Sequence, residues 1–199
     1  LTAKIFSSVG LKVSQYFFDL QDKLIVEKLV GLEVFGIYAA ISRLAFLVNV
    51  ILVTPFTFIW NPIMMESRTK KNVQEIFSVA NNIYISLAGF LLIPTYIFSD
   101  NLLKFAIKSN FIPLSEIQIP FLFLTMGILV YGYLNIISAG FLYSRKVHLI
   151  PFLLLPLVFF KYILVNQMVD KFGLNGAAIS SLLSYLILIF LVRLFSIRY

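Results

Sequence analysis

The chain has 199 residues, of which 60% are hydrophobic and only 13% are charged, and its formal net charge is +7. Soluble domains carry about 25% charged residues, and a small domain has too much surface to hide so many apolar side chains. Composition therefore excludes a water-soluble globule and favours a protein of the lipid bilayer, while the absence of cysteine excludes a disulfide framework, a thiolate nucleophile and a thiolate metal site.

Six stretches approach the length of about 20 mostly apolar residues that crosses a bilayer. The expected spans are residues 3–30, 34–63, 77–98, 119–142, 147–167 and 174–197. Polar residues interrupt the first span, whereas the other five are clear candidates because they are mostly apolar. The segment 100–111 is too short and too charged to span, so we expect it to be a short helix at the outer interface. The sequence predicts an all-α fold, a single polytopic bundle over residues 1–199.

One face of the first predicted helix is polar. Its members are Lys4, Ser8, Lys12, Gln15, Asp19 and Asp22. At 100° per residue they fall within roughly an 80° arc. A charge near the bilayer centre costs about 2.5–3.5 kcal/mol even on the most lenient scale, so we expect this stripe to line a water-filled cavity or the protein interior. The alternative is a helix that lies on the membrane surface.

Three cations are expected inside the membrane. They are Lys12 in the first span, Arg43 in the second and Lys161 in the fifth. A cationic cavity is what a phosphate-bearing substrate requires. The alternative for each residue is structural: an ion pair, for example between Asp19 and Arg43, or a lysine that snorkels to the headgroups.

The sixth span opens with small residues. They are Gly173, Gly176, Ala177, Ala178, Ser180, Ser181 and Ser184. Small side chains let helices approach closely in a membrane, so we interpret this stretch as packing and not as a site.

Sequence motifs for direct ATP use or for hydrolytic catalysis are missing, including GxxxxGK[ST], HExxH and GxSxG. The single histidine, His148, stands beside Arg145 and Lys146 at an expected membrane edge, where it suits an interface better than catalysis. We therefore expect no enzyme activity and no cofactor. The excess of basic residues is explained by topology, so we expect no nucleic-acid partner.

The loop charges predict an orientation. With six spans, one side holds eight basic residues, Lys4, Arg68, Lys70, Lys71, Arg145, Lys146, Arg193 and Arg198. The other side holds five, Lys23, Lys28, Lys104, Lys108 and Lys171. Because basic loops stay inside, both termini are expected in the cytoplasm.

Three short motifs resemble those of Wzx-type polysaccharide flippases of the MATE/MOP superfamily. The first runs from Asp22-Lys23-Leu24 through Gly31 to Gly36-Ile37-Tyr38. The second is Trp60-Asn61-Pro62, and the third is Phe172-Gly173-Leu174-Asn175-Gly176-Ala177-Ala178-Ile179. Their order resembles the C-terminal six-helix lobe of a two-lobed protein, so the resemblance implies that an N-terminal lobe is missing from this chain.

The resemblance implies export of undecaprenyl-pyrophosphate-linked oligosaccharide repeat units across the bacterial plasma membrane, by alternating access driven by H⁺ or Na⁺. On that reading Lys12, Gln15, Arg43 and Lys161 bind the substrate, and Asp19 or Asp22 takes part in ion coupling. Membrane lipids and the missing lobe are the other expected partners.

Two alternatives remain. A MATE-type exporter of cations predicts a cavity dominated by acids. A non-transporting membrane scaffold or assembly subunit predicts polar residues that pair off inside a closed bundle with no water-accessible cavity.

Overall fold

The computed structural model describes residues 20–107, 113–138 and 149–197, with only the backbone of 149–153 and 195–197. Within these ranges all regular structure is helical, which confirms the all-α prediction. Residues 20–30 form the first described helix. The elements that follow are α2 (Leu32–Val48), the π-helix η1 (Asn49–Val53), α3 (Thr54–Ser67), α4 (Val73–Ile97), α5 (Ser99–Ala106), α6 (Leu114–Ile137) and α8 (Leu149–Ile197).

Four helices in the described ranges are long and apolar enough to cross a membrane. They are Leu32–Ser67, which joins α2, η1 and α3, then Val73–Ile97, Leu114–Ile137 and Leu154–Leu194. The protein is therefore a helical membrane protein by length and composition. The count of six spans remains a prediction, because most of the expected first span, 3–30, lies outside the described residues.

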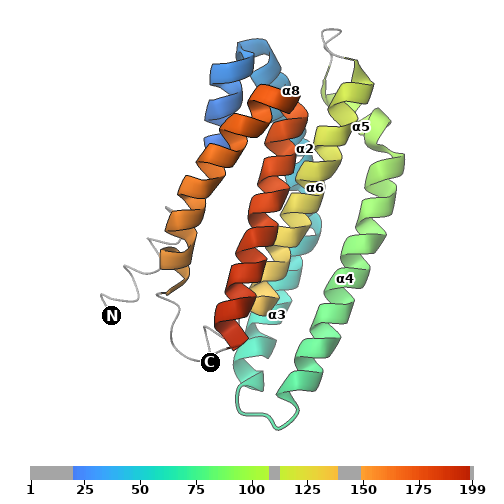
Figure 1. Ribbon diagram of the computed structural model, residues 1–199. Helices are drawn as coiled ribbons and strands as arrows, with labels where there is room; N and C mark the ends of the chain where they lie inside the picture. Colours follow the sequence, from blue (N-terminus) through green and yellow to red (C-terminus); the bar gives the residue numbers. More distant parts are fainter. Residues whose placement is uncertain (1–19, 108–112, 139–148, 198–199) are drawn as a thin grey trace.

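The last of the four helices consists of two antiparallel arms. Gly173 has non-helical angles (φ 57°, ψ −132°) that break α8, and Figure 1 shows the chain turning back at this point. Leu154 and Leu157 of the first arm pack against Leu188 and Val192 of the second. The described residues of the expected spans 147–167 and 174–197 fall in these two arms.

The small residues after the break hold the two arms together. A Cβ at Gly176 would lie 1.9 Å from the carbonyl oxygen of Met168 in the first arm, so any side chain there would force the backbones apart. Ala177 and Ala178 are fully buried. The interpretation of this stretch as close helix packing is confirmed at these positions.

The long helix Leu32–Ser67 widens just before Pro55. Pro55 cannot donate an amide hydrogen bond, and its ring crowds the preceding turn. The five residues Asn49–Val53 accordingly adopt π-helical geometry, a local widening that is frequent at functional sites. Thr57 donates its hydroxyl to the carbonyl of Val53 at 2.7 Å.

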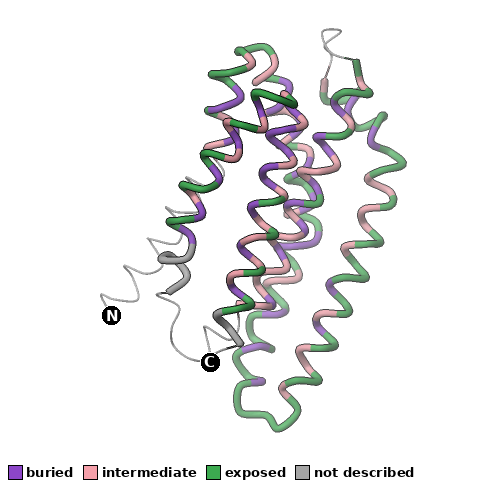
Figure 2. The backbone as a smooth tube through the Cα atoms, in the orientation of Figure 1, coloured by how far each residue is buried: buried purple, intermediate pink, exposed green. Residues whose placement is uncertain are grey.

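α6 is the central helix and packs against α2, α4, α5 and α8. The largest buried cluster joins Val26, Ile41, Ile117, Val165 and Ala177, which come from residues 20–30, α2, α6 and both arms of α8. Figure 2 shows the buried residues concentrated along these elements. The core therefore lies where residues 20–30 meet the α8 hairpin.

α4 forms an outer flank, and only Ala80 and Tyr84 on it are buried. The Tyr84 hydroxyl donates to the Leu129 carbonyl of α6 at 2.7 Å, and Tyr133 of α6 donates to Asn81. A Cβ at Gly132 would lie 2.2 Å from the Tyr84 hydroxyl oxygen. A few close contacts thus hold this helix.

The described connections alternate between the two ends of the bundle (Figure 1). The 68–72 loop and the C-terminal end of α8 lie at one end, and the turn before α2, the helix α5 and the turn within α8 lie at the other. The short helix expected over 100–111 corresponds to α5, Ser99–Ala106, although residues 108–112 lie outside the described ranges. Which end faces the cytoplasm stays a prediction.

Candidate functional site

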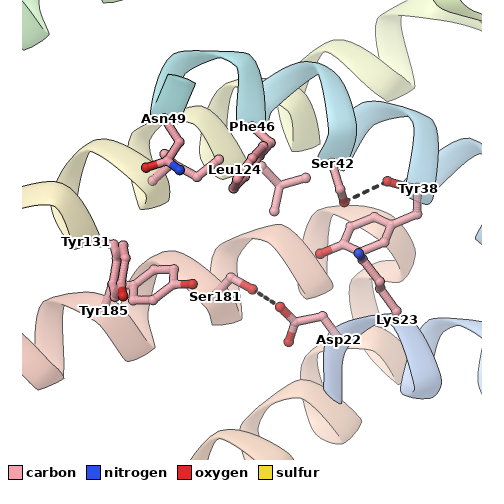
Figure 3. A pocket seen from close by; sticks show the side chains of 11 residues that line it. Asp22, Lys23, Tyr38, Ser42, Phe46, Asn49, Leu124, Tyr131, Ser181 and Tyr185 are labelled. Carbon is pink, nitrogen blue, oxygen red and sulfur yellow. Dashed lines mark hydrogen bonds between the residues drawn. The ribbon is translucent and has the colours of Figure 1, made fainter. Parts of the chain in front are cut away.

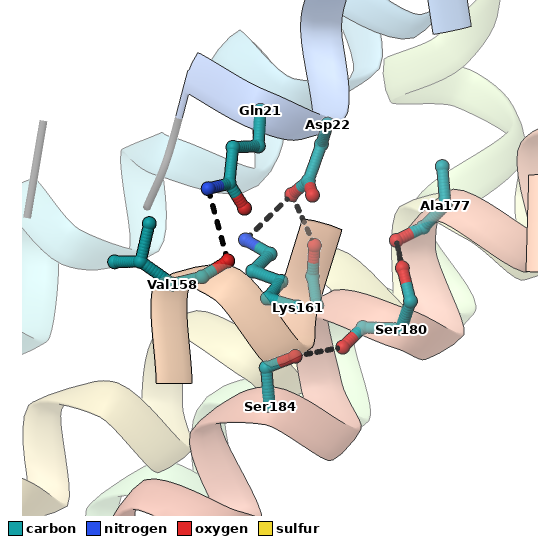
Figure 4. A network of polar contacts seen from close by, with 8 residues as sticks. Gln21, Asp22, Val158, Lys161, Ala177, Ser180 and Ser184 are labelled. Atoms are coloured by element: carbon teal, nitrogen blue, oxygen red, sulfur yellow. Dashed lines mark hydrogen bonds and ion pairs between the residues drawn. The ribbon is translucent and has the colours of Figure 1, made fainter. Parts of the chain in front are cut away.

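A buried ion pair joins the first described helix to the α8 hairpin. The Nζ atom of Lys161, in the first arm, lies 3.0 Å from Oδ2 of Asp22, and the two side chains are 0% and 9% exposed. The hydroxyl of Ser181, in the second arm, donates to the same carboxylate oxygen. Figure 4 shows the lysine pointing from α8 toward the carboxylate. One carboxylate thus links three helical segments.

Other polar contacts support this cluster. The Nε2 of Gln21 donates to the Val158 carbonyl at 3.0 Å, which fixes the same two segments one residue away from Asp22. The Lys161 ammonium lies 5.7 Å from the ring centroid of Tyr185, a distance at which a cation is attracted to an aromatic face. Because a buried charge is tolerated only when paired and hydrogen-bonded, these contacts make the burial of Lys161 possible.

A cavity of about 250 Å³ opens on the other side of Asp22. Its lining residues are Asp22, Lys23, Tyr38, Ser42, Phe46, Asn49, Leu124, Ile128, Tyr131, Ser181 and Tyr185. They come from residues 20–30, α2, η1, α6 and the second arm of α8, and Figure 3 shows their side chains around the cavity. The cavity therefore lies among the membrane-spanning helices.

The cavity wall is rich in neutral hydrogen-bonding groups and aromatic rings. One face of the helix Leu32–Ser67 carries Tyr38, Ser42 and Asn49, which are spaced by four and seven residues. Tyr131 and Tyr185 face each other with ring centroids 5.3 Å apart. Hydroxyl and amide groups both donate and accept hydrogen bonds, so this wall suits a neutral polyhydroxylated group.

The charges of the described wall nearly cancel. Asp22 and Lys23 are the charged lining residues among the described ones. Lys161 lies behind Asp22, does not line the cavity, and has its charge compensated there. The described part of the cavity is therefore not strongly cationic.

The structure places the predicted site residues in different surroundings. Asp22 lines the cavity and Lys161 pairs with it. Arg43 is exposed and does not line the cavity. At 100° per residue it lies about 60° around the helix from Phe46, which does. The other three predicted residues, Lys12, Gln15 and Asp19, lie outside the described residues, so the stripe of the first helix stays a prediction.

Sequence reasoning missed several cavity residues. Tyr38 and Asn49 lie in apolar runs, and their spacing on one helical face was the available signal. Ser181 was interpreted as packing, yet it contacts Asp22 and lines the cavity. Its separation of four residues from Tyr185 places both on one face, which is the pattern that distinguishes it.

Within the described ranges no three His, Cys, Asp or Glu side chains gather in a way that could hold a metal ion. The arrangement offers instead a sheltered polar space beside a buried ion pair.

No protein-family model, curated protein or solved structure matches the chain.

Proposed function

We propose that this chain is the membrane-embedded lobe of a transporter that carries undecaprenyl-pyrophosphate-linked oligosaccharide across the bacterial plasma membrane. The proposal draws its family from the resemblance of the Asp22, Trp60 and Gly173 motifs to Wzx-type flippases. The observation that carries it is the polar cavity among apolar spanning helices. A protein that only filled the bilayer would have no need of such a space, because each buried polar group costs free energy unless it is partnered.

The cavity wall suits the sugar part of this substrate. Sugar hydroxyls form hydrogen bonds with the hydroxyl and amide groups of Tyr38, Ser42 and Asn49, and the apolar faces of sugar rings pack on aromatic rings such as Tyr185. A volume of about 250 Å³ is close to the lower end of the range of about 300–1,000 Å³ found for ligand pockets. One or two sugar units at a time would occupy it, and Lys23 supplies a positive charge for the pyrophosphate.

The buried pair supplies a means of ion coupling. A proton or Na⁺ that binds Asp22 neutralises the carboxylate charge that Lys161 and Ser181 contact. Binding of the ion therefore weakens the contact between residues 20–30 and both arms of α8. Alternating access requires an element whose two arrangements differ in their affinity for the coupling ion, and the buried pair supports this junction as that element.

The scaffold alternative has one observation in its favour. Lys161 is paired off inside the bundle, as a purely structural protein would arrange it. The cavity beside it is the opposing observation, so accessibility to water separates the two functions. The cation-exporter alternative gains little, because the described wall carries one acid and one base.

Single cysteines test whether the cavity is wet, and the chain has no native cysteine. In the chain reconstituted in vesicles, Ser42→Cys and Asn49→Cys should react with a membrane-impermeant maleimide, because a thiolate forms only where water reaches it. Phe58→Cys, at a position that is 76% exposed on the outer face, is the matched control and should stay unlabelled in lipid. Equal protection of all three thiols would favour the scaffold.

Transport itself is tested in the complete protein by the appearance of the lipid-linked oligosaccharide in the outer leaflet. Asn49→Leu removes hydrogen-bonding groups from the wall, so we expect the export rate to fall at least tenfold, the equivalent of about 1.4 kcal/mol. Phe58→Leu should leave the rate unchanged. A normal rate for Asn49→Leu and for Tyr185→Leu, with both proteins inserted, would contradict the proposed function.

A further inference from the structure

An apolar groove runs along the outer face of the bundle between α3 and α4. Its volume is about 660 Å³. Ile59 and Ile63 line it from α3, and Ile76, Val79 and Ile83 line it from α4. Four of these five residues are at least 42% exposed, so the groove opens toward the acyl chains of the membrane. This groove is separate from the polar cavity and shares no lining residue with it.

One end of the groove carries charge. Asn72 and Glu75, at the start of α4, belong to its lining. The 68–72 loop, which ends at Asn72, contains Arg68, Lys70 and Lys71, all exposed. Lys70 is 4.0 Å from Glu66, whereas Arg68 and Lys71 form no ion pair with any described residue. The groove thus ends beside two cations available to an anion and one carboxylate.

We propose that this groove is a binding site for one membrane phospholipid, phosphatidylethanolamine. One acyl chain lies between α3 and α4, the phosphate contacts Arg68 and Lys71, and the ammonium contacts Glu75. We choose phosphatidylethanolamine because of the charges at this end of the groove. Basic residues at the end of a spanning helix attract lipid phosphate, and a carboxylate beside them repels a purely anionic headgroup but accepts hydrogen bonds from an ammonium.

A second apolar groove provides a contrast within the same protein. It lies between α4, α6 and the second arm of α8, has about 630 Å³, and none of its lining residues is charged. Acyl chains can enter both grooves, but of the two only the first has a charged residue, Glu75, in its lining. The proposal therefore predicts one selectively retained lipid at the α3–α4 groove and unselective lipid at the second groove.

Native mass spectrometry of the purified full chain in detergent measures lipid retention. Phosphatidylethanolamine, phosphatidylglycerol and phosphatidylcholine are added in turn, and we expect one molecule of the first to be retained most tightly. The double variant Arg68→Gln/Lys71→Gln should weaken its binding about thirty-fold, which corresponds to about 2 kcal/mol. Arg193→Gln, at an exposed arginine near the end of α8, is the matched control and should change nothing.

Two more variants test the headgroup and the tail separately. Glu75→Gln should reverse the preference in favour of phosphatidylglycerol, because the repelling carboxylate is gone. Val79→Trp fills the groove and should lower the retention of all three lipids. Equal retention of the three lipids by the unchanged chain, or full retention by Arg68→Gln/Lys71→Gln, would overturn the proposal. Tighter retention of undecaprenyl phosphate than of phosphatidylethanolamine would also overturn it, and would assign the groove to the substrate's tail.

Discussion

The two sides of this bundle are held together by different forces. On one side, Asp22, Lys161 and Ser181 join residues 20–30 to the α8 hairpin through charge and hydrogen bonds. On the other side, α4 rests on α6 through small close contacts around Gly132 and through the hydroxyls of Tyr84 and Tyr133. Lipid gives apolar helices no hydrophobic reason to associate. Each side therefore depends on a few specific residues, and removing one partner of the ion pair should cost more free energy than removing one neutral contact.

Replacing Lys161 is expected to have the largest effect. Lys161→Met leaves the buried Asp22 carboxylate without the lysine that compensates its charge, which costs about 3–5 kcal/mol. Denaturant titration of the protein in mixed micelles measures the free energy of unfolding. Adding Asp22→Leu removes the orphaned charge, so the double variant should recover most of the loss. If the two losses simply add, the carboxylate and the ammonium do not stabilise each other.

Gly132 tests the contact on the α4 side. A Cβ there would lie 2.2 Å from the Tyr84 hydroxyl oxygen and 2.7 Å from Val53 Cγ1, so Gly132→Ala should cost about 1–3 kcal/mol through overpacking. Gly89→Ala is the matched control, because nothing lies within 4 Å of an added Cβ at that position. The thermal midpoint of unfolding in detergent compares the two variants. Equal midpoints would show that α4 adjusts freely and is not fixed against α6.

Replacing Tyr84 is expected to have the smallest effect on stability, and it also tests the contact between Tyr84 and position 132. Tyr84→Phe removes the hydroxyl that donates to the Leu129 carbonyl, so we expect a loss of about 0.5–1.5 kcal/mol. Tyr96→Phe, on a ring that is 61% exposed, should change stability by less than about 0.5 kcal/mol. Because the same hydroxyl crowds an added methyl at position 132, Tyr84→Phe should relieve part of the Gly132→Ala cost. Strict additivity of the two changes would contradict this geometry.

Most of the helical architecture follows from the sequence because long apolar runs have few alternatives in a bilayer. The position of the α8 break, between the expected spans 147–167 and 174–197, follows from the same pattern. Asp22 and Lys161 were each recognisable as costly charges. Their pairing was not, because 139 residues separate them and periodicity describes only one helix at a time.

The cavity was harder to predict than the ion pair. A serine among small residues looks the same whether it packs a helix or binds a carboxylate, so Ser181 was grouped with its small neighbours although its spacing from Tyr185 places both on one helical face. The expected cationic cluster required Arg43 and Lys161 to face one space, and that depends on helix rotation. Lys161 turns toward Asp22 instead, and Arg43 lies outside the cavity lining.

The long separation within the ion pair has a consequence for how the protein is made. Asp22 leaves the ribosome first, and its partner Lys161 follows 139 residues later. At about 5–20 residues per second, translation needs roughly 7–28 s to produce that partner. Throughout this interval the segment that contains Asp22 carries a carboxylate without the lysine that later compensates it. Until the α8 hairpin emerges, water, other protein or a bound proton must offset the charge of this segment.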